Sequence, residues 1–197
     1  MTIYALSSGP GTSGISVIRV SGKETKNIIS KLTNGSFPKP RKATIKKINK
    51  INTNELIDEG IILWFPAPKS YTGEDMAEIH VHGSRSVIEA ILNSLSEMES
   101  CRIAEPGEFT KRAFQNDKIN LLKAESIGDL ISAETEIQRR QAINIMSGNS
   151  SKKFMTWREN LLKILSNIEA KIDFPDEDLP IDILKNIKTV SQKVKLE

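Results

Sequence analysis

The sequence predicts an α+β protein in which a mixed α/β domain is followed by a helical segment. Short β-branched runs separated by glycine and proline turns dominate the first part of the chain. After about Asn120 no strand pattern remains, and apolar residues recur at helical spacing. The chain of 197 residues suits one domain of ordinary size with a smaller appendage. We therefore expect domains over 1–118 and 119–197.

The α/β domain is expected to combine strands with at least two helices. Isoleucine alternates with lysine over 43–51, as in an edge strand or hairpin arm. Ser84 opens a helical pattern that runs to about Met98, and Ser86 and Glu89 stand at capping-box spacing. A proline-glycine turn at 106–107 precedes a further helix start. The expected strands cover 3–7, 15–20, 43–51, 55–64 and 76–82, and the expected helices cover 22–32 and 84–98.

The second domain is expected to be an α-helical hairpin. One apolar stripe runs from Ile127 to Met146, and Gly148 and Asn149 interrupt it. A second stripe runs over 154–172, ends at 174–175 and is followed by an acidic turn at 176–178 and a short helix to about 194. Two amphipathic helices leave the outer half of each stripe uncovered. We expect this segment to self-associate or to be the front part of a larger protein.

Composition excludes several classes of protein. Hydrophobic residues make up 38% and charged residues 27% of the chain, which argues against global disorder. The net charge of +3 is spread along the chain, so the surface is mildly basic without an RNA-binding signature. The single Cys101 excludes internal disulfides and suits a reducing cytosol. No signal peptide or membrane-spanning run is visible, and a cytoplasmic location is expected.

Glu78, His80 and His82 form a candidate site, because alternate residues of a strand project from one face. Two histidines and a carboxylate are a known catalytic zinc or iron set, although a polar strand face lining a pocket or interface gives the same pattern. Glu78 alone has a second use. A carboxylate accepts two parallel N–H bonds from an amino-substituted heterocycle such as a pterin or guanine. Pairing with a local arginine is the alternative.

Two cations stand in positions that suggest binding. Arg19 lies in an otherwise apolar strand, where an unpaired charge is costly, so its partner is either an internal acid or a ligand carboxylate. Lys118 lies at a helix-entry turn, where a surface lysine without a ligand is the default interpretation. The glycine-rich stretch 9–14 leads into a strand and lacks the Lys-Ser/Thr of a phosphate loop. No nucleotide-triphosphate cradle is therefore expected in this chain.

Six segments, in this order, resemble the tRNA modification GTPases of the MnmE (TrmE) family. They cover nearly the whole chain. They are ISVIRVSG (15–22), FPAPKSYTGED (65–75), EIHVHG (78–83), PGEFTKRAF (106–114), AESIGDLI (124–131) and IDFPDE (172–177).

The resemblance implies that 1–118 is a folate-binding and dimerisation domain similar in fold to the folate domain of aminomethyltransferases. It implies that 119–197 is the leading part of a helical domain, truncated before the GTPase domain that the family inserts there. GTP, magnesium and potassium would then belong to the full-length members only. This chain alone would not hydrolyse GTP. Full-length members act with an FAD-containing partner, MnmG (GidA), on the wobble uridine of tRNA, using a one-carbon unit from a tetrahydrofolate.

The resemblance also implies ligand roles for three residues. Arg19, Glu78 and Lys118 match family positions that contact 5-formyl-tetrahydrofolate. Glu78 suits the amino edge of the pterin, and the two cations suit polar oxygens or the anionic glutamate tail. Further candidates for the pocket wall or the dimer surface are Tyr71, Thr72 and Arg112.

Two alternatives stand beside this hypothesis. The first is a metal-dependent enzyme that uses Glu78, His80 and His82. The second is a helical interaction module without a ligand, whose working surface is the pair of apolar stripes.

Overall fold

The computed structural model describes residues 1–173 and 183–196, and it confirms the α+β class. The chain divides into two compact units, Met1–Asn120 and Leu121–Glu197, called here the first and second unit. The acidic turn predicted at 176–178 and the helix end predicted at 174–175 lie outside the described residues. Among the described helices, none is long and apolar enough to cross a membrane.

A six-stranded sheet forms the first unit, with strand order β3-β4-β5-β2-β1-β6. All neighbouring strands are antiparallel except β1 and β6, which are parallel. The expected edge strand, β3, does lie at an edge. The sixth strand was not predicted, because three residues are too few to show alternation. The strands are β1 (Thr2–Leu6), β2 (Ser13–Ser21), β3 (Thr44–Asn49), β4 (Leu56–Phe65), β5 (Met76–Gly83) and β6 (Cys101–Ile103).

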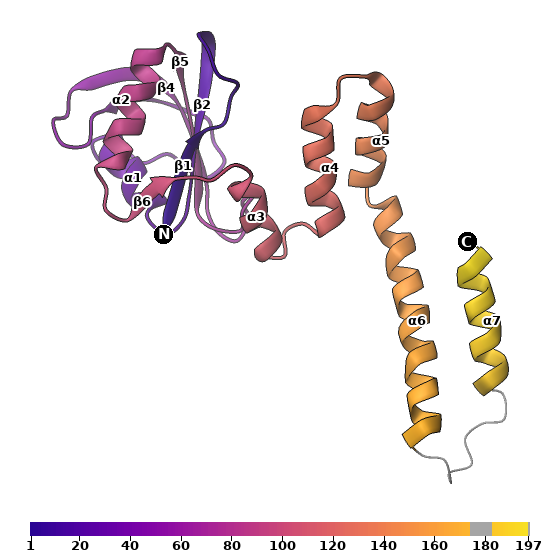
Figure 1. Cartoon of the computed structure of the whole chain (residues 1–197). Helices are drawn as coiled ribbons and strands as arrows, with labels where there is room; N and C mark the ends of the chain where they lie inside the picture. Colours follow the sequence, from indigo (N-terminus) through magenta and orange to yellow (C-terminus); the bar gives the residue numbers. More distant parts are fainter. Residues whose placement is uncertain (174–182, 197) are drawn as a thin grey trace. The chain divides into compact units, whose positions relative to one another are not determined.

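Helices α1 (Thr25–Leu32) and α2 (Arg85–Ser96) lie on the same side of this sheet (Figure 1). Their apolar residues and the inward residues of the strands form one buried cluster. Ile28 of α1 and Ile91 of α2, for example, share it with Ile18 and Ile79 of the two central strands. Burial of such side chains stabilises each by about 1.5–3 kcal/mol relative to exposure. The opposite sheet face, called here the open face, carries the alternate residues of β2 and β5.

The start of α2 differs from the sequence prediction in its capping residues. Ser84 is the N-cap, and its hydroxyl accepts a hydrogen bond from the Val87 N–H. The predicted capping box of Ser86 and Glu89 is wrong, because both residues lie inside the helix. The Ser86 hydroxyl contacts Ser84, and Glu89 pairs with Arg85 at 2.7 Å. A serine two positions earlier already satisfies the free N–H groups, so the second serine has no capping role.

The second unit contains more helices than the predicted hairpin. The stripe expected to run unbroken over 127–146 is divided between two helices, and Thr135 caps the second of them with Gln138 in a capping box. Gly148, with a φ of 88°, ends that helix where an interruption was predicted. The helices are α4 (Leu121–Ser132), α5 (Glu136–Met146), α6 (Asn149–Asp173) and α7 (Ile183–Leu196).

Candidate functional site

The open face brings together polar residues that are far apart in the sequence. In the β2–β5 register Arg19 lies opposite Glu78, and Val17 lies opposite His80. In the β4–β5 register Leu63 lies opposite Glu78. Residues directly opposite each other project from the same face of an antiparallel pair. The sheet therefore presents Arg19, Glu78 and His80 as one polar stripe within apolar neighbours.

Arg19 and Glu78 form an ion pair at the centre of this stripe. Both the Nε and Nη2 groups of Arg19 donate to Oε1 of Glu78, at 3.2 and 2.8 Å. The partner of the cation in β2 is thus an internal acid, one of the two alternatives that the sequence left open. The side chains are 28% and 19% exposed, so a solute can reach both.

Two aromatic rings flank the guanidinium of Arg19. Its Cζ lies 5.6 Å from the ring centroid of Tyr71 and 5.6 Å from that of Phe109. Both distances allow cation–π attraction. The Tyr71 and Thr110 hydroxyls are 2.9 Å apart, which joins the loop between β4 and β5 to helix α3 (Glu108–Gln115). The sequence alone does not single out Phe109, because only the fold brings α3 against the open face.

Lys118 follows α3 and lies against the same loop. Its N–H donates to the Ala113 carbonyl, and the side chain of Asn116 donates to the Thr72 carbonyl at 2.6 Å. A Cβ at Gly73, whose φ is 80°, would lie 2.9 Å from Lys118 Cε. Glycine at 73 therefore leaves room for the lysine chain as well as adopting the left-handed backbone.

Thr72 and Arg112, the remaining candidate residues from the sequence, are more buried than Arg19. Thr72 is fully buried, and its hydroxyl lies 2.7 Å from that of Ser21. Arg112 has a side chain that is only 13% exposed and pairs with Glu74 and Glu108. The Glu108–Arg112 pair could have been predicted from the sequence, because an acid and a base at i, i+4 spacing are neighbours on a helix. Nothing in the sequence pairs Arg112 with Glu74.

Glu108 is the most strongly perturbed acid of this region. Hydrogen bonds from Arg102 lower the pKa of Glu108 to about 2, against the opposing effect of burial, and the Glu105 N–H and Arg112 act in the same direction as Arg102. The carboxylate stays charged although the residue is only 6% exposed.

The two histidines of the strand have different partners. His80 Nε2 lies 3.5 Å from Glu78 Oε2, whereas the His82 ring lies 2.8 Å from Asp58. Burial alone would raise the pKa of Asp58, but hydrogen bonds from the backbone and ring of His82 lower it. Within residues 1–173 and 183–196 no group of three or more His, Cys, Asp or Glu side chains is placed to hold a metal ion. Glu78, His80 and His82 are not brought together as a metal triad.

A shallow hollow of about 190 Å³ adjoins the polar stripe on the open face. His80 and the exposed Ile61 line it, together with Ile15 and Gly60. An apolar floor beside charged groups is the usual character of a small-molecule site. The hollow extends the stripe toward the start of β2 and the end of β5.

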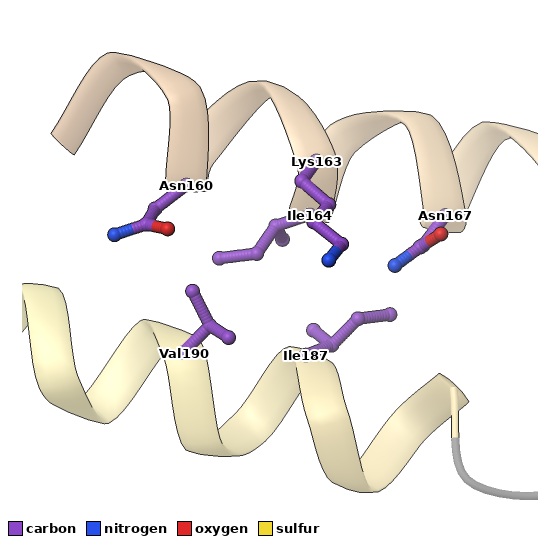
Figure 2. Close-up of a pocket in the computed structure, with 6 residues that line it drawn as sticks. All are labelled: Asn160, Lys163, Ile164, Asn167, Ile187 and Val190. Atoms are coloured by element: carbon purple, nitrogen blue, oxygen red, sulfur yellow. The ribbon is translucent and has the colours of Figure 1, made fainter. Parts of the chain in front are cut away.

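The second unit contains hollows of a different kind. Figure 2 shows Ile164 of α6 facing Ile187 and Val190 of α7, with Asn160 and Asn167 beside them. The space that these residues line has a volume of about 160 Å³. Its polar groups are amides and Lys163. Another hollow, of about 280 Å³, lies where α4 meets α5. Asp129 and Ser132 line the second hollow, but among the described lining residues of either hollow there is no histidine or cysteine to act as a base or a thiol nucleophile.

Comparison with known proteins identifies the family. Residues 2–118 match the family described as GTP-binding protein TrmE N-terminus, and residues 121–197 match the family described as MnmE helical domain. A tRNA modification GTPase MnmE of Pelagibacter ubique (strain HTCC1062) is 71% identical over 196 residues, which cover 100% of this chain and 44% of that protein.

More distant relatives agree. Proteins of the same name from Granulibacter bethesdensis and Rickettsia bellii are each 46% identical over 95% and 94% of this chain. The chain covers 42% of each, so it spans less than half the length of these relatives. With both units matched by its domain families, the chain belongs to the TrmE/MnmE family of tRNA modification GTPases.

Proposed function

We propose that the first unit binds a reduced folate, 5-formyl-tetrahydrofolate or a related tetrahydrofolate, on the open face. The observation that carries the proposal is the solvent-accessible Arg19–Glu78 pair between the rings of Tyr71 and Phe109. A pterin is flat, apolar on its faces and rich in N–H donors at its edge. Aromatic walls beside a carboxylate complement both properties.

The donor set fits such a ligand. Oε1 of Glu78 accepts both bonds from Arg19, while Oε2 lies 3.5 Å from His80, so the carboxylate retains acceptor capacity. Glu78 would hold the amino edge of the pterin, and Arg19 and Lys118 would attract the anionic glutamate tail. The bound tetrahydrofolate would supply the one-carbon unit for modification of the RNA base.

We further propose that the first unit dimerises through the open face. Ile15, Ile45 and Ile61 are exposed large apolar residues, and Ile45 and Ile61 are direct cross-strand partners on β3 and β4. Exposed apolar residues next to a ligand site are typical of an interface. As part of a longer protein the chain would act in the cytoplasm, with an FAD-containing partner and tRNA. GTP hydrolysis, with its magnesium and potassium, is assigned to a part of the family that this chain does not span.

Calorimetric titration with 5-formyl-tetrahydrofolate tests the folate proposal. We expect saturable binding by the wild type and at least about a tenfold loss of affinity in Glu78→Gln, because removing one charged hydrogen-bond acceptor costs about 1.5–3 kcal/mol. Glu89→Gln is the matched control, since Glu89 forms an exposed ion pair on α2. Equal affinities of the three proteins would remove Glu78 from the site, and no binding by the folded wild type would refute the proposal.

A second candidate function, as a helical interaction module, has its own observation. Large apolar side chains of α6 remain exposed, namely Phe154, Met155, Leu161, Leu162, Leu165, Ile168 and Ile172. Such a face is typical of a surface that other helices cover. This function concerns the second unit and is compatible with folate binding by the first.

A further inference from the structure

Arg112 lies in α3 and joins this helix to the loop between β4 and β5, and both segments border the candidate folate site. Its Nη1 donates to Glu74 Oε2 at 2.9 Å, and its Nε and Nη2 donate to Glu108 Oε1 at 3.3 and 3.0 Å. Glu74 belongs to the loop between β4 and β5, and Glu108 is the first residue of α3. One guanidinium therefore holds the loop against the helix. A planar fork with fixed donor directions suits this double contact.

The two linked segments supply the aromatic rings around Arg19. Tyr71 stands three residues before Glu74 in the loop, and Phe109 directly follows Glu108 in α3. Each ring centroid lies 5.6 Å from Arg19 Cζ. The distance between the loop and the helix thus sets the distance between the rings. Arg112 binds Glu74 and Glu108, which are within three residues of Tyr71 and Phe109 in the same two segments.

The loop and α3 meet at further points. Asn116 donates to the Thr72 carbonyl, and the chain of Lys118 fills the space above Gly73. Ser21 of β2 donates to Glu74 Oε2 at 2.8 Å, which ties the same carboxylate to the sheet. A shift of the loop away from α3 would therefore displace Lys118 as well as Tyr71.

We propose that Arg112 is a positioning residue: it holds the β4–β5 loop on α3 and thereby sets the rings of Tyr71 and Phe109 around Arg19 for folate. The part concerning folate rests on the function proposed above. The Arg112 side chain is 13% exposed and is engaged by Glu74 and Glu108, so it would act through these partners. Preorganisation of this kind raises affinity by removing the cost of ordering the site on binding.

Arg102 provides a matched control for a purely stabilising role. Its Nη1 and Nη2 donate to the same Glu108, at 2.8 and 2.6 Å, and Nη1 also donates to the Ile103 carbonyl. These bonds tie β6 to α3, whereas Arg112 ties the loop to α3 through Glu74 and also donates to the Met1 carbonyl at 3.0 Å. Loss of Arg102 should therefore lower stability without separating Tyr71 from Phe109.

Two readouts test the proposal on the full chain, with Arg112→Gln, Arg112→Lys and Arg102→Gln compared with wild type. The first is the NMR resonance of the Arg19 Nε–H, which senses the ring currents of its two aromatic neighbours without any ligand. The second is the affinity for 5-formyl-tetrahydrofolate. We expect Arg112→Gln to shift the resonance and weaken binding about tenfold, with partial recovery in Arg112→Lys and little change in Arg102→Gln.

The outcomes separate this proposal from the folate proposal. If the wild type does not bind folate, the proposed folate-binding function is refuted. The Arg19 resonance would still show whether Arg112 controls the positions of the Tyr71 and Phe109 rings. An unchanged resonance and affinity in Arg112→Gln, or equal effects of Arg102→Gln at equal loss of stability, would overturn the positioning role. Should Arg112→Gln fail to fold, Glu74→Gln removes the charge of the loop carboxylate that Arg112 and Ser21 share, and it leaves Glu108 paired.

Discussion

Glu108 carries a nearly buried charge that its neighbours neutralise from three directions. Arg102 and Arg112 donate to its two oxygens, and the Glu105 N–H donates to Oε2. These bonds favour the ionised form and hold its pKa at about 2, below the ordinary value of 4.5. A carboxyl whose folded pKa is lowered stabilises the fold above its unfolded pKa and loses that effect as pH falls toward the folded value.

We therefore predict an acid-dependent loss of stability in the first unit between about pH 4.5 and 2, worth up to about 3 kcal/mol from this residue. Urea unfolding of wild type and Glu108→Gln, measured from pH 7 to pH 3, checks this. The variant should be less stable at pH 7, and its stability should depend less on pH. Parallel pH profiles would show that other groups cause the acid sensitivity.

The sequence predicts which kind of partner a residue needs better than it predicts which residue that partner is. A cation within an apolar strand requires a partner, and Glu78 on another strand was a candidate acceptor. Their pairing depends on the β2–β5 register, which places Arg19 opposite Glu78 and which no local pattern specifies. The role of Glu74 could not be predicted either, since it depends on how a turn-rich loop folds onto α3.

Among the elements, the break between α4 and α5 is the clearest departure from the predicted helices. The apolar period continues across it, so periodicity alone indicates one helix. Thr135 and Gln138 mark the start of the new helix α5, because the Thr135 hydroxyl accepts from the Gln138 N–H and the Gln138 side chain accepts from the Thr135 N–H. Strands were easier to predict, since alternation over several residues has few competing explanations.

Replacing Thr135 by alanine should weaken the start of α5 by about 1 kcal/mol, because one N–H of the first turn loses its acceptor. Amide hydrogen exchange at 136–139 should become about five times faster. Thr156→Ala is the control, since Thr156 lies inside α6 and its hydroxyl bonds back to the Lys152 carbonyl. If exchange in α5 is the same in both variants, the cap does not define the boundary.

At the scale of the whole molecule, the buried apolar cluster lies entirely within the first unit, from Tyr4 to Cys101. In the second unit, by contrast, the described part of α6 contains no buried residue. Elements that bury side chains in one shared core unfold together in a single cooperative transition. The first unit should therefore account for the main unfolding transition of the chain.

A fragment of residues 1–120 is predicted to fold alone and to unfold cooperatively within about 5 °C of the main transition of the full chain. Near-UV circular dichroism and calorimetry measure this, and the full chain is the reference. A fragment that binds a hydrophobic dye and lacks near-UV signal would show that the second unit is needed for packing. Folate affinity of the folded fragment would then locate the ligand site in the first unit.

The parallel pairing of β1 with β6 has a consequence for biosynthesis. Strand β1 leaves the ribosome before the other five strands of its sheet, yet one of its two partners, Cys101–Ile103, is made almost a hundred residues later. Long-range pairings of this kind form slowly. Until β6 arrives, one side of β1 offers unpaired backbone groups to any other nascent chain. Translation past Ile103, and not the completion of β5, is thus the event that ends this vulnerable period.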